Sequence, residues 1–490
     1  MAITQLPIGT GFYESDSLPI SAQECVNWFV NIPQAPALSA ETLFGTPGAT
    51  ELATSGTVKQ SNNGSHVMAG IPYYINGDGL FRLNKVVVDD VDTFSMEQLG
   101  TLAFTGDPVR VSMADNGTQL MILIPGGEGY IFTEDPDTFT EITAVDFRAN
   151  GEPQHVAFLD GYFVVTTDTK KFIISSLNDG LSYNALDFGT AEADPDDIVA
   201  PVVFNNQLFI MGSETTEAFQ NIGGADFPFQ RSGLFLTKGL FAPFSAIVAS
   251  DTFFFIGGGT NESPAIWAFV GNNVKKVSTT AIDSILQGFT ESEIDEAFAW
   301  SYAQKGAYFV GFSLPTTTLV LDTVTQKWHE RKSQVEVAPG VVNLVRYRAN
   351  SFVSAYGRVL IGDIQDGRVG SVEPETFTEY GRNILRRVAT QPFQNNMQAF
   401  FLPWIELTTE SGVGTTETPN PQIRMDISLN GGKTYRDDKA RPLGKKGEYE
   451  RRAIWRRLGR VPRFAVFRFT LSDAVKPVLI ALYANIQGSQ

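Results

Sequence analysis

Few side chains of this sequence have the types and spacing that catalysis requires. The chain has three histidines, His66, His155 and His329, and each stands alone in the sequence. A catalytic base is recognised by the partners that position it, so an isolated histidine is far more often structural. The single cysteine, Cys25, can form no internal disulfide, and without clustered histidines the sequence predicts no structural zinc site. We therefore expect no catalytic residue, no bound cofactor and no metal site.

Two further stretches have compositions that occur in binding or catalytic sites. The acidic stretch Asp194-Pro195-Asp196-Asp197 lacks the spaced ligands and central glycine of a calcium loop, and acidic turns are usually solvated. The stretch from Ser428 to Tyr435 resembles the Asp-box hairpin of sialidase-like propellers, where it is a folding element. No glycine-rich loop followed by a helix is present, so nucleotide hydrolysis has no sequence support.

The most unusual segment combines arginine with tryptophan near the end of the chain. Its candidate protein-interface residues are Arg451, Arg452, Trp455, Arg456, Arg457, Arg460 and Arg463. Such residues neutralise and stack on nucleic acid, or anchor protein interfaces, where both types are favoured hot spots. Because the rest of the chain is acidic, we favour protein contact. We expect alanine at Trp455, Arg456 and Arg457 together to leave folding intact and to block assembly.

Charge is distributed unevenly along the chain. The formal net charge is −17, which speaks against a protein that coats nucleic acid. Residues 381–490 hold 18 Lys+Arg and 9 Asp+Glu, giving +9, whereas residues 1–380 hold 19 and 45, giving −26. A step of this size indicates a domain boundary near residue 380.

One structural unit recurs along most of the acidic part. Seven copies of turn, strand, turn and strand begin at the turn residues Gly70, Gly117, Gly161, Asn206, Asp251, Gly306 and Gly357. Short β-branched and aromatic runs broken by Gly, Asn and Asp are typical of hairpins, and three or four strands about every 45 residues make a propeller blade. A row of β-sandwich modules is the alternative, but each module needs about 100 residues. The sequence predicts an all-β protein with a β-propeller of six or seven blades, since one copy could supply only a ring-closing strand.

The predicted organisation has three regions. Residues 1–54 are expected to form an extended N-terminal arm that packs on other elements. Residues 55–380 are expected to form the propeller, with a short helical insertion near 280–300 that the capping box Thr290-Glu291-Ser292-Glu293 indicates. Residues 381–490 are expected to form a basic C-terminal β domain resembling a β-sandwich. We expect no membrane-spanning segment and no secretory signal, since no apolar run approaches the roughly 18 residues that a bilayer requires.

Several stretches, in order along the chain, resemble the packaged-DNA-stabilisation proteins of short-tailed bacteriophages, also called tail hub or nozzle proteins. The similar stretches are residues 18–29, which include Asn27-Trp28-Phe29, and residues 44–48, 177–196, 280–331 and 454–460. The resemblance implies a structural protein of the virion tail, present in the host cytoplasm during assembly, with no catalytic residues to carry over. It implies a homohexameric ring below the portal and its adaptor ring, which closes the exit channel to retain packaged DNA and conducts the DNA at ejection.

The implied partners are further copies of the chain, the portal-adaptor ring, and tail needle, fibre or spike proteins. Packaged DNA would pass through the ring without sequence-specific binding, because an acidic wall repels phosphates at distances within about 8 Å. The basic C-terminal domain would dock on acidic partners such as the adaptor ring. Two alternatives stay open at this point: a propeller serving as a binding module of a phage tail, and a glycosidase acting on host surface polysaccharide.

Overall fold

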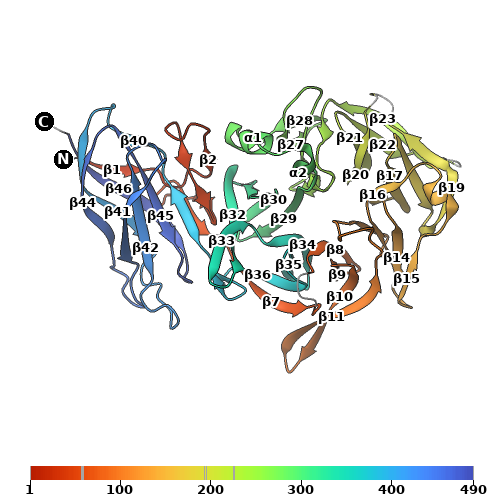
Figure 1. The fold of residues 1–490 in the computed structure, drawn as a ribbon, viewed down its shortest axis with the longest axis horizontal. Helices are drawn as coiled ribbons and strands as arrows, with labels where there is room; N and C mark the ends of the chain where they lie inside the picture. Colours follow the sequence, from red (N-terminus) through yellow and green to blue (C-terminus); the bar gives the residue numbers. More distant parts are fainter. Residues whose placement is uncertain (1, 57–59, 192–193, 195, 225–226, 489–490) are drawn as a thin grey trace.

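The structure is a computed structural model that describes residues 2–56, 60–191, 194, 196–224 and 227–488 (Figure 1). Pro195 of the acidic stretch lies outside the described residues, as do residues 192–193 just before that stretch. A ring of small sheets forms one side of the molecule, and a second β domain, drawn in blue, lies beside it. The predicted all-β propeller with a C-terminal β-sandwich is confirmed.

Seven blades make up the propeller in the described part of the chain, and every strand pairing within them is antiparallel. The first strands face the centre of the ring: β8 (Asn62–Met68), β12 (Ser112–Asp115), β16 (Pro153–Leu159), β20 (Ile198–Phe204), β25 (Ile247–Ala249), β29 (Phe298–Gln304) and β34 (Ala349–Ala355). The second strands are β9 (Ile71–Asn76), β13 (Gln119–Leu123), β17 (Tyr162–Thr167), β21 (Gln207–Gly212), β26 (Thr252–Gly258), β30 (Ala307–Ser313) and β35 (Arg358–Asp363).

The third strands are β10 (Gly79–Val88), β14 (Gly129–Thr133), β18 (Lys171–Ser176), β22 (Thr216–Asn221), β27 (Ala265–Val270), β31 (Thr318–Asp322) and β36 (Arg368–Glu373). The outer strands are β11 (Val91–Thr101), β15 (Thr138–Glu141), β19 (Asp179–Thr190), β23 (Phe229–Leu236), β28 (Asn273–Lys276), β32 (Lys327–Ala338) and β7 (Gly48–Thr54). Blade 5 is irregular, because β24 (Gly239–Leu240) and β25 share the inner position beside β26, with the short helix η2 (Pro243–Ser245) between them. A second short helix, η1 (Val145–Arg148), follows β15.

The seven predicted turn residues all lie between the first and second strands of a blade. Their backbones are left-handed, with φ between +58° and +90°, and in six of the seven turns the preceding residue also has a positive φ. Turns with two left-handed residues match the right-handed twist of the strands that they join. The repeat was therefore visible in the sequence because Gly, Asn and Asp adopt this backbone conformation most readily.

A strand from the N-terminal region closes the ring. Residues 48–54, which the sequence analysis placed in the arm, form β7, and β7 pairs with β36 as the outer strand of blade 7. All seven repeat copies thus contribute at least three strands to a blade of their own, and none serves only to close the ring. The propeller has seven blades because the closing strand comes from outside the repeat.

The C-terminal domain is a sandwich of two sheets, and the N-terminal region supplies strands to both. One sheet has the order β44 (Ala453–Val461), β41 (Phe400–Thr409), β46 (Val478–Gly488), β6 (Thr42–Gly45) and β5 (Trp28–Asn31), with β1 (Ala2–Leu6) also on β46. The other has the order β4 (Cys25–Val26), β39 (Arg386–Ala389), β45 (Phe464–Leu471), β42 (Gln422–Ser428) and β43 (Arg436–Pro442), with β40 (Phe393–Gln394) also on β45. β4 also pairs in parallel with β32, so this second sheet continues into blade 6.

Several short elements complete the described fold. The predicted helical insertion consists of α1 (Thr280–Gln287) and α2 (Glu291–Asp295), and the capping box between Thr290 and Glu293 is present. The hairpin of β2 (Tyr13–Glu14) and β3 (Ala22–Gln23) contacts α1 through the hydroxyls of Tyr13 and Thr280. β33 (Val341–Arg346) extends β32, and β37 (Thr378–Glu379) and β38 (Arg382–Asn383) connect blade 7 with the sandwich. The predicted limit at residue 380 falls in this connection and stays a prediction.

The side chain of Asn27 joins the arm, the propeller and the sandwich. Its amide nitrogen donates to the carbonyl oxygens of Lys332, at 2.8 Å, and Leu385, at 2.7 Å. Its amide oxygen accepts from the backbone nitrogen of Lys332 at 3.0 Å, and its own backbone nitrogen donates to the carbonyl of Glu330 at 2.8 Å. Asn27 is only 2% exposed and has a φ of +57°. Asparagine fits because it tolerates the left-handed backbone and offers both a donor and an acceptor.

One continuous apolar core extends through the same junction. Trp28 of the arm, Phe312 and Trp328 of blade 6, and Phe400 of the sandwich all belong to it. Burial of such large side chains is worth about 1.5–3 kcal/mol each, so the junction is stabilised like the interior of a single domain. The arm is therefore an integral part of both domains.

We predict that Asn27→Ala lowers the free energy of unfolding by about 3–5 kcal/mol, because partly buried backbone partners in blade 6 and just before the sandwich strand β39 lose their hydrogen bonds. Urea denaturation followed by tryptophan fluorescence measures this change. Asn178→Ala is the matched control, since Asn178 has a similar φ of +56° in an exposed turn. If Asn27→Ala lowers the free energy of unfolding no more than Asn178→Ala does, the hydrogen bonds of the Asn27 side chain contribute nothing to stability.

Candidate functional site

The arginine-rich segment lies on and beside the edge strand of one sandwich sheet. β44 pairs only with β41, so its other edge has no strand partner among the described residues. Six of the seven candidate residues are exposed and together form what we call the arginine surface: Arg451, Arg452, Arg456, Arg457, Arg460 and Arg463. Charged residues on an edge strand prevent unwanted strand pairing, and they also offer a surface for a partner of opposite charge.

A β-bulge exposes two consecutive arginines on this strand. The pairing with β41 shifts between Leu402 and Trp404, and Arg457 has a left-handed backbone with a φ of +59°. Side chains in a regular strand alternate between the two faces, so one of two neighbours would normally point inward. At the bulge Arg456 and Arg457 are both exposed, and the local density of positive charge increases.

Most of the arginine surface is not neutralised within the chain. Arg452 forms a two-pronged ion pair with Glu406, which raises the pKa of Arg452. For the other five arginines, no carboxylate of the described residues lies within ion-pair distance. Exposed positive charges without intramolecular partners are available to an acidic surface, and such charges increase association rates.

Trp455 does not belong to the exposed set, and its assignment to an interface is corrected. Its side chain is 0% exposed, its indole nitrogen donates to the carbonyl of Lys439 at 2.6 Å, and its ring packs against Phe469. Alternate side chains of β44 point into the sandwich before the bulge. Trp455 occupies one of these inward positions, two residues after the buried Ala453. The triple alanine variant that includes Trp455 would therefore disturb the core, contrary to the expectation that folding stays intact.

The three histidines lie apart from one another. His66 contacts the carboxylate of Asp115 at 2.6 Å. Burial lowers the pKa of His155 to about 4, and burial beside Arg331 holds the pKa of His329 well below its usual range. Two of the histidines are therefore neutral at pH 7, and no pair of histidines is brought together.

The acidic stretch has a structural role in its described part. The carboxylate of Asp196 accepts hydrogen bonds from the backbone nitrogens of Glu214 and Thr215, both at 2.8 Å. It thereby fixes the turn between β21 and β22 in blade 4. No group of three or more His, Cys, Asp or Glu side chains with the geometry of metal ligands occurs within the described ranges.

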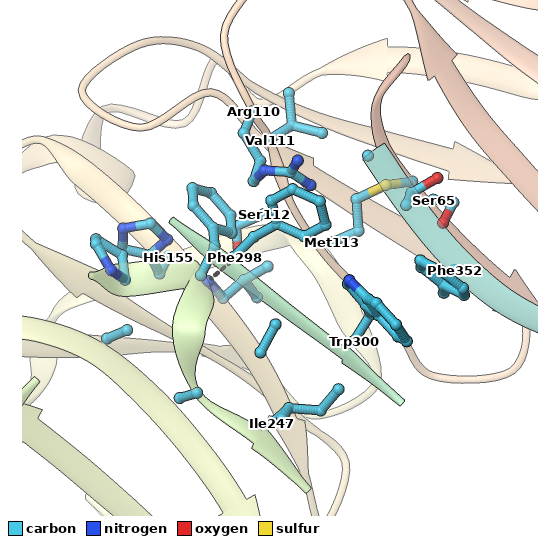
Figure 2. Close-up of a pocket in the computed structure, with 18 of the residues that line it drawn as sticks. Ser65, Arg110, Val111, Ser112, Met113, His155, Ile247, Phe298, Trp300 and Phe352 are labelled. Carbon is cyan, nitrogen blue, oxygen red and sulfur yellow. Dashed lines mark hydrogen bonds between the residues drawn. The ribbon is translucent and has the colours of Figure 1, made fainter. Parts of the chain in front are cut away.

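The central channel of the propeller is a site that the sequence reasoning missed. It holds a cavity of about 340 Å³, lined by residues of the first strands of all seven blades. Figure 2 shows Arg110, His155, Phe298, Trp300 and Phe352 around this cavity. These residues are far apart in the sequence, and Arg110 is an isolated arginine in a loop. No local motif could have indicated them.

These features define an all-β structural scaffold, in which a propeller is fixed to a sandwich that carries a row of exposed arginines. The family model described as "Bacteriophage P22 Gp10, beta-propeller" matches residues 4–377, and "Bacteriophage P22 Gp10, beta-sandwich" matches residues 386–487. The chain belongs to the bacteriophage P22 Gp10 family, and it is a structural protein of a phage tail.

One relative and several solved structures are similar to the chain. The "Tail hub protein gp10" of Salmonella phage P22 is 22% identical over 292 residues, which span 57% of this chain and 58% of the relative. The WD40 propeller domain of Doa1 is 12% identical over 66% of this chain and 98% of that one, with a TM-score of 0.39. The extracellular domain of the hybrid two-component system BT4673 from B. thetaiotaomicron is 8% identical, and the match covers 77% of this chain and 45% of that one, with a TM-score of 0.42. No helix in the described part of the chain is long and apolar enough to cross a membrane.

We predict that Trp455→Ala and Arg456→Ala change the free energy of unfolding by very different amounts although the residues are neighbours. The first should lower the free energy of unfolding by about 3–5 kcal/mol, because it empties a large core position. The second should change it by less than about 0.5 kcal/mol, because Arg456 is exposed and has no ion-pair partner among the described residues. Chemical denaturation of both variants checks this, and equal losses would contradict the burial of the indole.

Proposed function

We propose that the chain forms a homohexameric ring below the portal and its adaptor ring, where it closes the exit channel, retains packaged DNA and conducts the DNA at ejection. The proposal follows from membership of the P22 Gp10 family and from the similarity to a tail hub protein. The observation that carries it is the division of charge between two parts fixed to each other. Residues 1–380, which include the whole propeller repeat and the N-terminal arm, carry −26, and residues 381–490, which form most of the sandwich, carry +9.

The division of charge suits the two surfaces that such a ring needs. An acidic surface toward DNA keeps phosphates from adhering, since like charges repel strongly within the screening length of about 8 Å. A basic surface on the sandwich can dock on acidic partners, and the arginine surface is its most concentrated part. We therefore assign the contact with the portal-adaptor ring to the arginine surface. DNA passes through the ring without sequence-specific recognition.

The propeller serves in this proposal as a rigid scaffold without catalytic activity. Its loops protrude from a closed ring of sheets and offer attachment points for the tail needle, fibre or spike proteins. The long hairpin of β10 and β11 has four exposed valines near its tip, at Val86, Val87, Val88 and Val91, which suits contact with another protein of the tail. Before it enters the virion tail, the chain would be present in the host cytoplasm.

We predict that the triple variant Arg456→Glu, Arg457→Glu and Arg460→Glu folds normally and fails to join the tail. Reversal of three charges replaces attraction to an acidic partner by repulsion. Phage particles made with this variant should lack the tail hub and lose their DNA, as measured by electron microscopy and by the yield of filled particles. Circular dichroism of the isolated variant checks that it is folded.

The matched control reverses the same number of charges elsewhere on the sandwich. Arg424→Glu, Lys433→Glu and Arg436→Glu alter exposed side chains on and beside the β42–β43 hairpin, which belongs to the other sandwich sheet. Particles with the control variant should assemble like the wild type. If particles with the arginine variant assemble normally, the arginine surface is not the docking surface. If particles with the arginine variant and particles with the control variant both fail to assemble, the change in net charge alone explains the failure.

A further inference from the structure

Two arginines from different parts of the chain meet beside the propeller channel. Arg110 lies in the loop before β12, and its guanidinium carbon is 3.7 Å from the centre of the Phe298 ring, above which Figure 2 shows it. Arg346 ends β33, and its guanidinium carbon is 5.6 Å from the centre of the same ring. Both guanidinium groups thus lie around one aromatic side chain of blade 6.

A single asparagine holds both arginines in place. Arg110 donates to the carbonyl oxygen of Asn350 at 2.9 Å, and Arg346 donates to the side-chain oxygen of Asn350 at 2.8 Å. The side-chain nitrogen of Asn350 in turn donates to the carbonyl of Asn62. Asn350 begins blade 7 and Asn62 begins blade 1, so the group lies where the ring closes.

The two positive charges have no ion-pair partner within the described residues, although Glu296 acts on Arg346 from a greater distance. No carboxylate there lies within ion-pair distance of Arg110 or Arg346, although Arg348 nearby forms a buried ion pair with Asp363 at 2.5 Å. Burial and the neighbouring Arg346 lower the pKa of Arg110 to about 9, and burial lowers the pKa of Arg346 to about 10. Both pKa values are lowered, so the surroundings disfavour the positive charge of each arginine.

Another buried arginine shows what distinguishes this group. Arg386 also lacks a carboxylate partner, but it stands alone, is 0% exposed, and donates to the backbone carbonyls of Ile384 and Thr46. Arg110 and Arg346 are partly exposed, and Arg110 lines the open cavity of the channel. Two guanidinium groups held by one asparagine, of which Arg110 lines a solvent-accessible cavity, form an arrangement that can receive an anion.

We propose that the propeller channel binds a small oxyanion of the phosphate class between Arg110 and Arg346. The planar guanidinium group presents paired donors that match the oxygen atoms of such an anion. The cavity of about 340 Å³ has room for the anion and several water molecules. The bound anion neutralises the two charges and ties the loop before blade 2 to the segment before blade 7, across the closure of the ring. This proposal does not depend on the role of the chain in the tail.

Isothermal titration of the full chain with sodium phosphate, in a chloride buffer of constant ionic strength, tests the site. The wild type should bind one phosphate per chain in a saturable manner, and its melting temperature should rise by about 2 °C at saturation. Arg110→Gln and Arg346→Gln should each weaken binding about tenfold or more and abolish the rise, because one charged partner is lost. Arg424→Gln, which removes an exposed arginine of the sandwich, should bind like the wild type.

Melting temperatures without phosphate distinguish an anion site from a purely structural pair. Arg346→Gln should melt no lower than the wild type in phosphate-free buffer, because it relieves repulsion while glutamine still offers a donor to Asn350. Arg346→Lys keeps the charge without the planar donors and should bind phosphate more weakly than the wild type. Absence of saturable binding to the wild type, or equal binding by the wild type and the Arg110 and Arg346 variants, would overturn the proposal.

Discussion

The side-chain amide of Asn27 holds together three segments that lie far apart in the sequence. It bonds to Lys332 of blade 6 and to Leu385 before the sandwich, from a left-handed backbone within the arm. Unsatisfied polar groups in the interior are costly, so these bonds specify one position of the arm between the two domains. The apolar core around Trp28 then packs against a junction whose geometry is already set. The acidic and basic parts of the chain are thereby held in a fixed relation.

The course of the arm explains how a propeller of this kind resists opening. From the sandwich, where β1, β4, β5 and β6 pair, the chain runs directly into β7, which closes blade 7. Opening the ring at this blade would break the β7–β36 pairing and also pull on the strands in the sandwich. In the proposed ring the chain would bear load while DNA is retained, and closure through a second domain would suit that task. The same closure holds Asn350 beside Asn62, and with it the arginine pair of the channel.

The sequence revealed features that short segments encode by themselves. The blade turns could be predicted because residues such as Gly161 and Asn206 favour the left-handed backbone that a tight hairpin needs. The role of β7 could not, because its partner β36 lies about 320 residues later and pairing over such a separation leaves no local signal. The burial of Trp455 was missed because the segment was judged by its arginine and tryptophan content, whereas Ala453 and Trp455 occupy alternate inward positions of β44. The channel arginines were missed because their proximity depends on how the ring closes.

We infer that this chain forms a tail ring in which the propeller and the sandwich move as one body. Cryo-electron microscopy of intact virions with imposed and with relaxed symmetry tests it most directly. We expect density for six copies around the tail axis below the portal and adaptor, each with β4 paired to both β32 and β39 as in the isolated chain. Density for this chain away from the exit channel, or copies in which the sandwich is separated from blade 6, would contradict it.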